Sequence, residues 1–503
     1  MLSTLVGSRL PVQYQRFFRL PKRTVSTAVV DTADTTLGRQ VEEWMSLHNA
    51  ANGVCRLADG ARALDIRLRL IGLAESTIDI QSYLVRDDLS GNRIMIALID
   101  AAERGVRVRL LMDDALTQPV DPGLLAVSKH PNIDVRVFNP FPRHRSRFVS
   151  FIANFNLLNR RMHNKSFTVD SQFTIVGGRN LADEYFQSST MNEFLDEDLL
   201  AIGNVVSDVS SGFDEYWNTR ESTPIEFLGQ GQSLPSIPEL LQQGQKFLVE
   251  QSGISAVTVE NDGGDLVLGE GGLELVAADP ELVLDHPDKV RGLVRARVGE
   301  TTEHLAKMVS TAEKELFVVS PYFVPLKAGV ELFASLVKRG VRVVVVTNSL
   351  ASTNHSSVHA VYARYRKPLL RNGVELYELR RNPETREGVA DQVTTVTLHS
   401  KVAVVDRVKM FVGSFNLDPR SLYINTEMGM AVESAKLSTE MAESIERILP
   451  RLAYRLELTN KGELCWSFLR DGVEETLRKE PHTTFWRRLS TWLMSLLPIE
   501  GQM

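Results

Sequence analysis

The chain has 503 residues, of which 43% are hydrophobic and 24% charged, and its formal net charge is -6 at pH 7. At about 150 residues per domain, this length predicts two to four domains with sizeable cores. The absence of an overall positive charge argues against a nucleic-acid partner. The two cysteines, Cys55 and Cys465, are far apart in the sequence, which argues against a disulfide framework and a clustered zinc site.

Residues 1–40 are interpreted as a separate N-terminal segment. Residues 9–23 contain five basic residues and no acidic one, and they include Phe17 and Phe18. This composition fits either a surface anchor or a frayed terminus. Residues 1–30 lack the apolar stretch of a secretory signal, and no uninterrupted apolar run is long enough to span a bilayer, so we expect any membrane contact to be peripheral.

An internal repeat organises the rest of the chain. A strand (76–83), a helix (93–104) and a strand (105–112) are predicted first, and the same order returns at 315–322, 327–338 and 340–346. Each half therefore predicts a βαβ unit, with a mainly parallel sheet covered by helices. We expect a first domain over 41–227, a linker or insertion rich in Gly, Gln and acids over 228–298, and a second domain over 299–460.

A basic and aromatic stretch lies between the first βαβ unit and the first catalytic motif. Arginines cluster at 143–147 and at 160–161, and Phe148, Phe151 and Phe155 follow helical spacing. This spacing fits an amphipathic helix at least as well as a platform for stacking bases. Such a helix would either face acyl chains or pack on the core of the protein.

The decisive pattern is a duplicated His-x-Lys-x4-Asp motif. The first copy holds His163, Lys165 and Asp170, and the second holds His399, Lys401 and Asp406. In both copies a small-residue pair and then an asparagine follow the histidine at identical spacing; these residues are Gly177-Gly178 with Asn180, and Gly413-Ser414 with Asn416. Chance does not readily produce two copies in matching register.

These residue types suit transfer of a phosphate-linked group. Alternation along a strand places the histidine and lysine of each copy on one face, and a pseudo-twofold axis would bring both pairs into one pocket. The lysines, the asparagines and the backbone around Gly178 and Ser414 could bind phosphate oxygens. One imidazole would attack phosphorus, and the other would act as general acid and base. We expect neither metal nor cofactor.

An attacking imidazole needs its second ring nitrogen held by an acceptor, usually a carboxylate. In the second half the candidate is Glu427, in the run Asn425-Thr426-Glu427 that follows the second motif; in the first half we favour Asp198, with Asp196 in reserve. Asp170 and Asp406 complete the motifs and are counted with the catalytic set. Each could anchor the lysine or a turn, and support is the role we expect.

At these residues the sequence resembles the phospholipase D superfamily, over about residues 40–225 and 300–460. The runs Asp183-Glu184-Tyr185-Phe186 and 413–421 resemble bacterial cardiolipin synthases, particularly the C-type branch. The resemblance implies a duplicated α/β/α sandwich with the active site between its halves. It also implies phosphatidyl transfer onto phosphatidylglycerol from another phospholipid. Members of this branch often begin with a lipoprotein-type signal, whereas Ser8 stands here where a lipidated cysteine would be.

Three activities remain open: a phosphatidyltransferase, which we favour, a hydrolytic phospholipase D, and a nuclease. The transferase and the hydrolase differ only in whether a lipid hydroxyl or water resolves the phospho-histidine. We expect phospholipid substrates and a bacterial protein peripheral to the cytoplasmic membrane, on a face left open. The oligomeric state is left open too.

The C-terminal part, residues 461–503, is interpreted as an amphipathic tail. Leu489, Trp492, Leu493 and Leu496 share one helical face, next to Arg487 and Arg488. This pattern predicts an interfacial helix or a helix docked on the core of the protein. His355 and His359, after the strand ending at residue 346, occupy a loop position typical of ligand contacts, but a lone loop histidine is more often structural.

Overall fold

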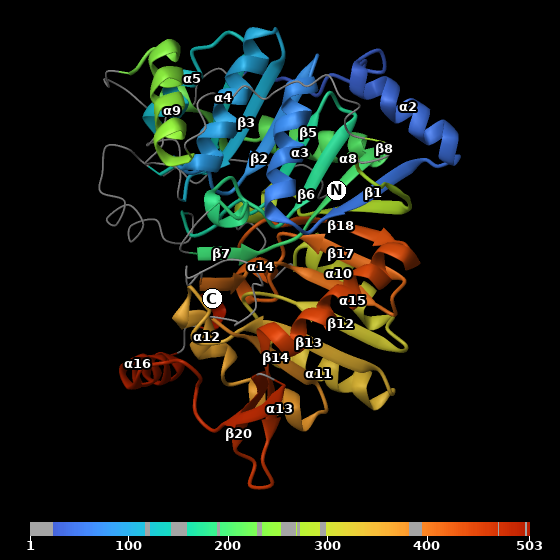
Figure 1. Ribbon diagram of the computed structural model, residues 1–503, viewed down its shortest axis with the longest axis vertical. Coiled ribbons are helices and arrows are strands. Elements are labelled where there is room, and N and C mark those ends of the chain that lie inside the picture. Colours follow the sequence, from blue (N-terminus) through green and yellow to red (C-terminus); the bar gives the residue numbers. More distant parts are fainter. Residues whose placement is uncertain are drawn as a thin grey trace, which may run out of the picture.

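The structure is a computed structural model, and it describes residues 24–115, 121–141, 158–188, 192–228, 234–252, 268, 272–291, 298–381, 395–470, 472–497 and 500–502. Two α/β domains are stacked along the long axis (Figure 1). The segments 1–23 and 142–157, where an anchor and an amphipathic helix were considered, lie outside the described residues.

The first domain is built on a nine-stranded sheet with the order β10-β1-β8-β6-β5-β2-β3-β4-β9. β2, β3 and β4 run parallel, and the other neighbours pair antiparallel. The strands are β1 (Asn52–Leu57), β2 (Thr77–Ser82), β3 (Arg107–Asp113), β4 (Ile133–Phe138), β5 (Ser166–Val169), β6 (Phe173–Gly177), β8 (Asp198–Gly203), β9 (Ser222–Pro224) and β10 (Val276–Ala277).

The second domain repeats this order in a ten-stranded sheet, β11-β18-β17-β16-β12-β13-β14-β19-β20-β21. Its strands are β11 (Asp279–Leu284), β12 (Glu315–Val319), β13 (Arg342–Asn348), β14 (Glu375–Leu379), β16 (Val402–Val405), β17 (Lys409–Gly413), β18 (Met428–Glu433), β19 (Ala453–Leu458), β20 (Leu464–Arg470) and β21 (Val473–Leu477). Again only β12, β13 and β14 are parallel neighbours. The duplicated α/β fold is thus confirmed, but the expectation of mainly parallel sheets was wrong, because each histidine motif leads into an antiparallel hairpin (β5–β6 and β16–β17).

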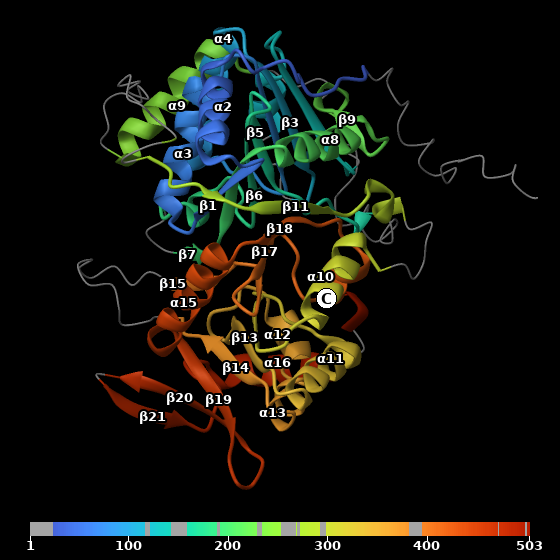
Figure 2. The same cartoon turned by 90° about the vertical axis from the view of Figure 1, so that its right-hand side faces the viewer.

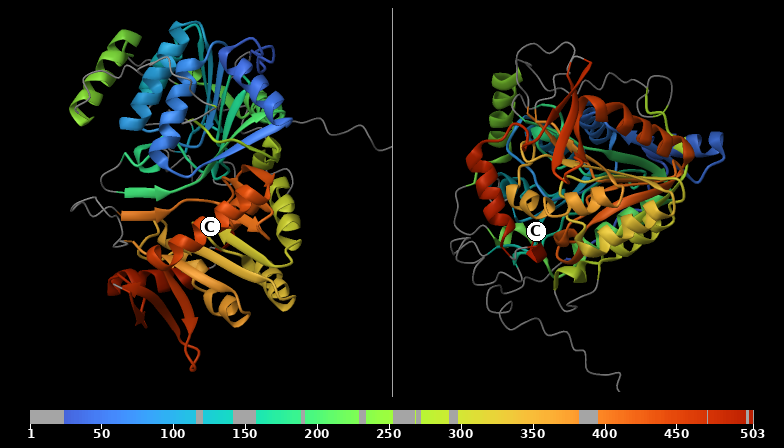
Figure 3. Two further views of the ribbon diagram at one scale, coloured as in Figure 1. Left: turned by 45° about the vertical axis from the view of Figure 1, so that its right-hand side comes forward. Right: turned by 90° about the horizontal axis from the view of Figure 1, so that it is seen from below.

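Helices cover both faces of each sheet, as Figures 2 and 3 show. In the first domain α2 (Thr36–His48), α3 (Gly60–Leu73), α4 (Leu89–Glu103) and α5 (Asp121–Val127) accompany the sheet, and α8 (Val205–Asn218) covers the opposite face from α3 and α4. In the second domain α10 (Glu300–Ser310), α11 (Leu326–Lys338) and α13 (Arg366–Arg371) pack opposite α15 (Ala435–Leu452). Aspartates begin several helices; Asp88 accepts a hydrogen bond from the Gly91 amide at the start of α4.

The two domains share a hydrophobic core and two parallel backbone pairings. One buried cluster joins Val176 and Leu199 of the first sheet to Val344 and Met430 of the second. Between the sheets, β7 (Asn192–Leu195) pairs with β15 (Thr395–Leu398), and Met162 forms an isolated parallel bridge with Thr426. Each pairing therefore ends one residue before a motif histidine.

The segment 228–298 contributes regular structure to both domains. The helix α9 (Ile237–Ser252) packs against α4, β10 extends the first sheet and β11 extends the second. Short 3-10 turns lie at Asp183–Tyr185, Ile225–Phe227, Pro287–Arg291 and Glu500–Gln502.

The tail 461–503 also contains regular structure. β20 and β21 extend the second sheet beyond residue 460, and they are followed by the helix α16 (Phe485–Ser495). The short helices α12 (Ser356–Tyr362) and α14 (Pro419–Tyr423) follow β13 and β17. Among the described residues, no helix is long and apolar enough to cross a bilayer.

Candidate active site

His163 lies between the Met162–Thr426 bridge and β5. Its backbone amide donates to the Thr426 carbonyl at 2.9 Å, and its Nδ1 lies 2.8 Å from a carboxylate oxygen of Glu427. The ring of Tyr83 meets the imidazole edge-on, with centroids 5.1 Å apart. With the proton on Nδ1, the carboxylate holds the ring and leaves Nε2 unprotonated.

Glu427 is itself held from two sides. The hydroxyls of Ser414 and Ser421 both donate to its carboxylate, and the Ser421 contact measures 2.7 Å. Burial would raise the pKa of this carboxyl, but His163, Ser414 and Lys165 hold it below its usual range. The carboxylate therefore stays ionised beside the imidazole.

His399 has the equivalent environment, built from the other domain. It follows β15 directly, and its amide donates to the carbonyl of Leu195, the last residue of β7. Its Nδ1 lies 2.6 Å from an oxygen of Asp196, and its ring stacks on Phe194. Burial would raise the pKa of Asp196, but His399 and Lys401 hold it well below its usual range.

The carboxylates thus cross between the halves, and the predicted assignment was wrong. Glu427 was expected to hold His399 but holds His163, and Asp198 was favoured where Asp196 makes the contact. The chain leaves β7 after Leu195 and starts β8 at Asp198, so the two aspartates do not share one uninterrupted strand. Asp198 instead pairs with Arg67 at 2.8 Å and with Arg179 at 3.2 Å.

The two lysines lie beside the histidines of their own motifs. Lys165 donates to the carbonyl oxygen of His163 at 2.6 Å. The Nζ of Lys401 lies 2.9 Å from Nδ1 and 3.2 Å from Nε2 of His399. Both His-Lys pairs are buried, and the charges of the two lysines influence one another, so the structure brings the four residues into one site.

Burial and mutual repulsion set the protonation of this site. Burial and Lys401 lower the pKa of Lys165 to about 7, and burial lowers that of Lys401 to about 8. Burial is also the main reason why the pKa of His163 falls to about 4 and that of His399 to about 3. Near neutral pH the site therefore presents two neutral imidazoles and at least a partial positive charge on the lysines.

Asp170 and Asp406 lie at the far ends of their strands and touch neither lysine. Asp170 accepts hydrogen bonds from the backbone amides of residues 75–77, and Asp406 accepts from those of residues 313–315. Five residues of extended chain separate Asp170 from Lys165, or about 16 Å. Their contacts are those of turn anchors, and the ion pair with the lysine that was considered does not form.

The small residues of the motif make room for the carboxylates. A Cβ added at Gly178 would stand 2.1 Å from an oxygen of Asp196, whereas the equivalent Ser414 donates to the longer Glu427. The amides of Gly178 and Ser414 donate to the carbonyls of Glu197 and Met428, so they are not available to phosphate. This corrects the phosphate-binding role expected for these two residues.

The motif asparagines are buried and keep an uncommitted amide oxygen. The Oδ1 atoms of Asn180 and Asn416 have no hydrogen-bond partner among the described residues. The Asn180 amino group donates to the Tyr185 hydroxyl at 2.8 Å. Flipping this amide, so that its oxygen and nitrogen exchange places, would keep a bond to Tyr185, now donated by the hydroxyl, and would leave an N–H free for a ligand.

The aromatic neighbours of the histidines were missed at the sequence level. Tyr83 directly follows β2 and meets His163, whereas Tyr185 and Phe194 contact the His399 ring and each other. The one available signal was the position of Tyr83 at the carboxyl end of a parallel strand, where α/β folds place ligand-binding residues. Nothing in the local sequence marks Phe194, because it reaches His399 through the β7–β15 pairing.

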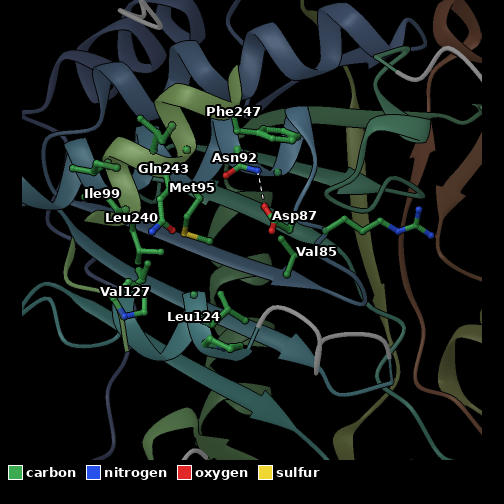
Figure 4. Close-up of a pocket in the computed structure, with 18 residues that line it drawn as sticks. Val85, Asp87, Asn92, Met95, Ile99, Leu124, Val127, Leu240, Gln243 and Phe247 are labelled. Carbon is green, nitrogen blue, oxygen red and sulfur yellow. Dashed lines mark hydrogen bonds between the residues drawn. The ribbon is translucent and has the colours of Figure 1, made fainter. Parts of the chain in front are cut away.

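Two cavities lie beside the helices of the two domains. A mostly apolar cavity of about 320 Å³ lies between α10, α11 and the second sheet, and Lys401 forms part of its wall. Another, of about 450 Å³, lies between α4, α5 and α9 in the first domain and includes no motif residue (Figure 4). Of these two cavities, only the first is lined by a motif lysine, Lys401.

The two histidines expected in a loop after β13 belong to the helix α12: His355 is its N-cap, and His359 lies within it. His359 is buried, and the Nη2 of the Arg366 guanidinium lies 2.7 Å from its Nε2. His355 meets Tyr322 edge-on. In the described part of the chain, no group of three or more His, Cys, Asp or Glu side chains is placed to hold a metal ion.

Two α/β domains that each supply a His-Lys pair, with the carboxylates exchanged between them, define an enzyme of the phospholipase D superfamily. The family described as "Cardiolipin synthase, PLD-like domain" matches residues 68–217 and 305–449. The chain belongs to this family.

Named relatives agree with this assignment. Cardiolipin synthase C of Escherichia coli is 38% identical over 465 residues, which cover 90% of this chain and 97% of that protein. Cardiolipin synthase A of Pseudomonas aeruginosa is 26% identical over 79% of this chain and 68% of that protein. The crystal structure of phosphatidylserine synthase from Haemophilus influenzae shares the fold, with a TM-score of 0.57 at 11% identity, over 92% of this chain and 99% of that one.

Proposed function

We propose that the protein is a phosphatidyltransferase of the cardiolipin synthase type, which moves a phosphatidyl group from one phospholipid to the hydroxyl of another. The observation that carries this proposal is the crossed pair of His–carboxylate contacts, His163–Glu427 and His399–Asp196, in a chain 38% identical to cardiolipin synthase C. Two oriented imidazoles suit a two-step exchange at phosphorus.

In the first step, the Nε2 of His163 attacks the phosphorus of the donor lipid. A P–N bond forms, the bond from phosphorus to the leaving alcohol breaks, and protonated His399 supplies the proton that this alkoxide takes. One contact supports this order of roles. Lys165 donates to the backbone oxygen of His163 and not to its ring, so the Nε2 lone pair of His163 is left for the attack. Lys401 contacts the backbone oxygen and both ring nitrogens of His399, and burial together with the charge of Lys401 lowers the pKa of His399, which makes its protonated form a strong acid.

In the second step, neutral His399 takes the proton of the acceptor hydroxyl, whose oxygen attacks phosphorus and releases His163. Lys165 and Lys401 bind the phosphate oxygens throughout, and their positive charge opposes the negative charge of the transition state. A bound phosphodiester adds negative charge to the site, which raises the pKa values of the lysines and of His399 towards the forms that this cycle needs.

The apolar cavity beside Lys401 supports a lipid rather than a nucleic acid as substrate. A wall of aliphatic and aromatic side chains next to a phosphate-binding lysine suits a molecule with both an apolar and an anionic part. A peripheral position at a bacterial membrane follows from such a substrate.

Product analysis tests the proposal. We expect the purified protein, incubated with phosphatidylglycerol and a second phospholipid, to form a diphosphatidyl product that mass spectrometry detects. His163→Ala serves as the control for contaminating activity. Phosphatidic acid as the sole product would instead assign a hydrolytic phospholipase D, and cleavage of oligonucleotides without lipid products would assign a nuclease.

A further inference from the structure

The C-terminal helix α16 is fixed to the second domain by its polar side. It packs on α12, and Thr491 is the one buried residue of the helix. Arg487 donates from its guanidinium to the Thr353 carbonyl at 3.1 Å, and Arg364 donates to the carbonyls of Ser495 and Leu497. Figure 1 shows α16 beside α12 at the lower left of the molecule.

The opposite side of α16 is apolar and exposed to solvent. Trp486 is 74% exposed, Leu496 63% and Trp492 57%, and Phe485, Leu493 and Leu497 are each at least half exposed. The other large exposed apolar residues among the described parts of the chain do not gather on one helix in this way. A contiguous apolar face of this kind on a folded protein marks a contact surface.

The surroundings of this face are basic. The helix contains Arg487 and Arg488 and no acidic residue, and exposed Arg478 and Lys479 precede it. The nearest acid before the helix, Glu480, is committed to an ion pair with Arg366. Tryptophans and leucines beside unneutralised cations are the composition of helices that lie in the interface of anionic membranes.

Hydrogen bonds connect α16 to the segment of the second domain that leads into His399. Arg487 bonds to Thr353, and the adjacent Ser352 carbonyl accepts a 2.9 Å hydrogen bond from the hydroxyl of Thr397. Thr397 stands two residues before His399. In the same loop region the Asn348 side chain bonds to both backbone groups of Leu398.

We propose that α16 is a membrane-docking helix that lies in the plane of an anionic phospholipid surface and places the side of the active site that holds His399 against this surface. The proposal rests on the proposed function for the assumption that the substrate lies in that surface. The docking itself depends only on the exposed apolar face and its basic surroundings.

Flotation of the full chain with lipid vesicles tests this. The test variant is Trp486→Ser with Trp492→Ser and Leu496→Ser, all at exposed positions. The matched control is Leu469→Ser with Val473→Ser, which removes exposed apolar side chains from the β20–β21 hairpin. With vesicles of phosphatidylglycerol and phosphatidylcholine, we expect the triple variant to lose binding by on the order of tenfold or more, because three large apolar side chains no longer leave water. The control should float like the wild type.

Activity separates this proposal from the proposed function. On vesicles, the triple variant should lose turnover in parallel with its binding, whereas on short-chain phospholipids dispersed as monomers it should match the wild type. Absence of lipid products from the wild type on either substrate would reject the proposed function and leave the docking result standing. Unchanged flotation of the triple variant would overturn the docking role. A triple variant that self-associates less than the wild type by light scattering, but still floats with vesicles, would overturn it too.

Discussion

At the scale of single residues, the proposed mechanism gives the phosphorus to His163 and the acid-base role to His399. His163→Ala and His399→Ala should each lower turnover on the order of 10³-fold or more, because nucleophile and acid-base catalyst act as one unit. Lipid product analysis measures this loss. Retention of a tenth of wild-type turnover by either variant would contradict the two-histidine mechanism.

The same pair of variants distinguishes the two roles. With a donor whose leaving group needs no proton, His399→Ala should accumulate a phosphatidyl adduct on His163, since the second step lacks its base. Intact mass and peptide mapping detect the adduct, and the variant that lacks both histidines is the blank. An adduct that instead accumulates on His399 in His163→Ala would reverse the assignment.

Residue patterns predicted both His-Lys pairs because a short motif at fixed spacing carries them. They did not predict which carboxylate contacts which histidine. Asp196 and Glu427 reach the histidines through pairings between domains, β7 with β15 and Met162 with Thr426, and a sequence pattern within one half contains no information on these pairings. The choice of Asp198 failed for this reason, although it lies only two residues from Asp196.

At the scale of elements, Asp170 and Asp406 hold the motif hairpins to the strands beside them. Both residues have positive φ, 49° and 54°, so asparagine is the substitution that fits this backbone best. We expect Asp170→Asn to lower the free energy of unfolding by about 1–3 kcal/mol, because a charged acceptor of three amides is lost. Asp406→Asn should cost at least as much, because, against the effect of burial, the amides of residues 313–315 hold the pKa of Asp406 below its usual range, whereas burial raises the pKa of Asp170 and offsets part of the contribution of its charge.

Denaturant titration measures these changes, with turnover of the folded fraction measured alongside. We expect turnover to stay near that of the wild type for both variants. A loss of turnover as large as that of the histidine variants, on a protein of unchanged stability, would return these aspartates to the catalytic set.

Helix and strand order within each βαβ unit followed from hydrophobic periodicity, and α4, α11 and the central strands lie close to their predicted positions. Edge strands were harder to predict. β10 and β11 come from the predicted linker and are short or half-exposed, so their side chains do not show the pattern of a buried strand.

At the scale of the whole molecule, the site exists only where the two halves meet. Each histidine takes its carboxylate from the other domain, and the apolar cluster between the sheets is common to both domains. Placing two lysines in one buried site lowers their pKa values, which makes the pH dependence of catalysis a property of the assembled pair of domains.

This coupling gives a signed prediction for kcat/KM, which reports the free enzyme. The first step needs protonated His399, but a pKa of about 3 leaves this residue neutral in the free enzyme near pH 6, so kcat/KM should already fall as pH rises through this range. As pH rises further, through about 7 and 8, Lys165 and Lys401 lose their protons and their attraction for the phosphate, so the fall in kcat/KM should steepen.

Removing one lysine should shift the fall caused by the other. Lys401→Met should lower kcat/KM strongly at every pH. It should also move the remaining alkaline fall to higher pH, because the positive charge of Lys401 is, after burial, the main cause that lowers the pKa of Lys165. Lys409→Met, which changes a surface lysine paired with Glu433, is the matched control and should keep the wild-type profile. An alkaline fall that stays in place or moves to lower pH in Lys401→Met would show that the two lysines do not share one site.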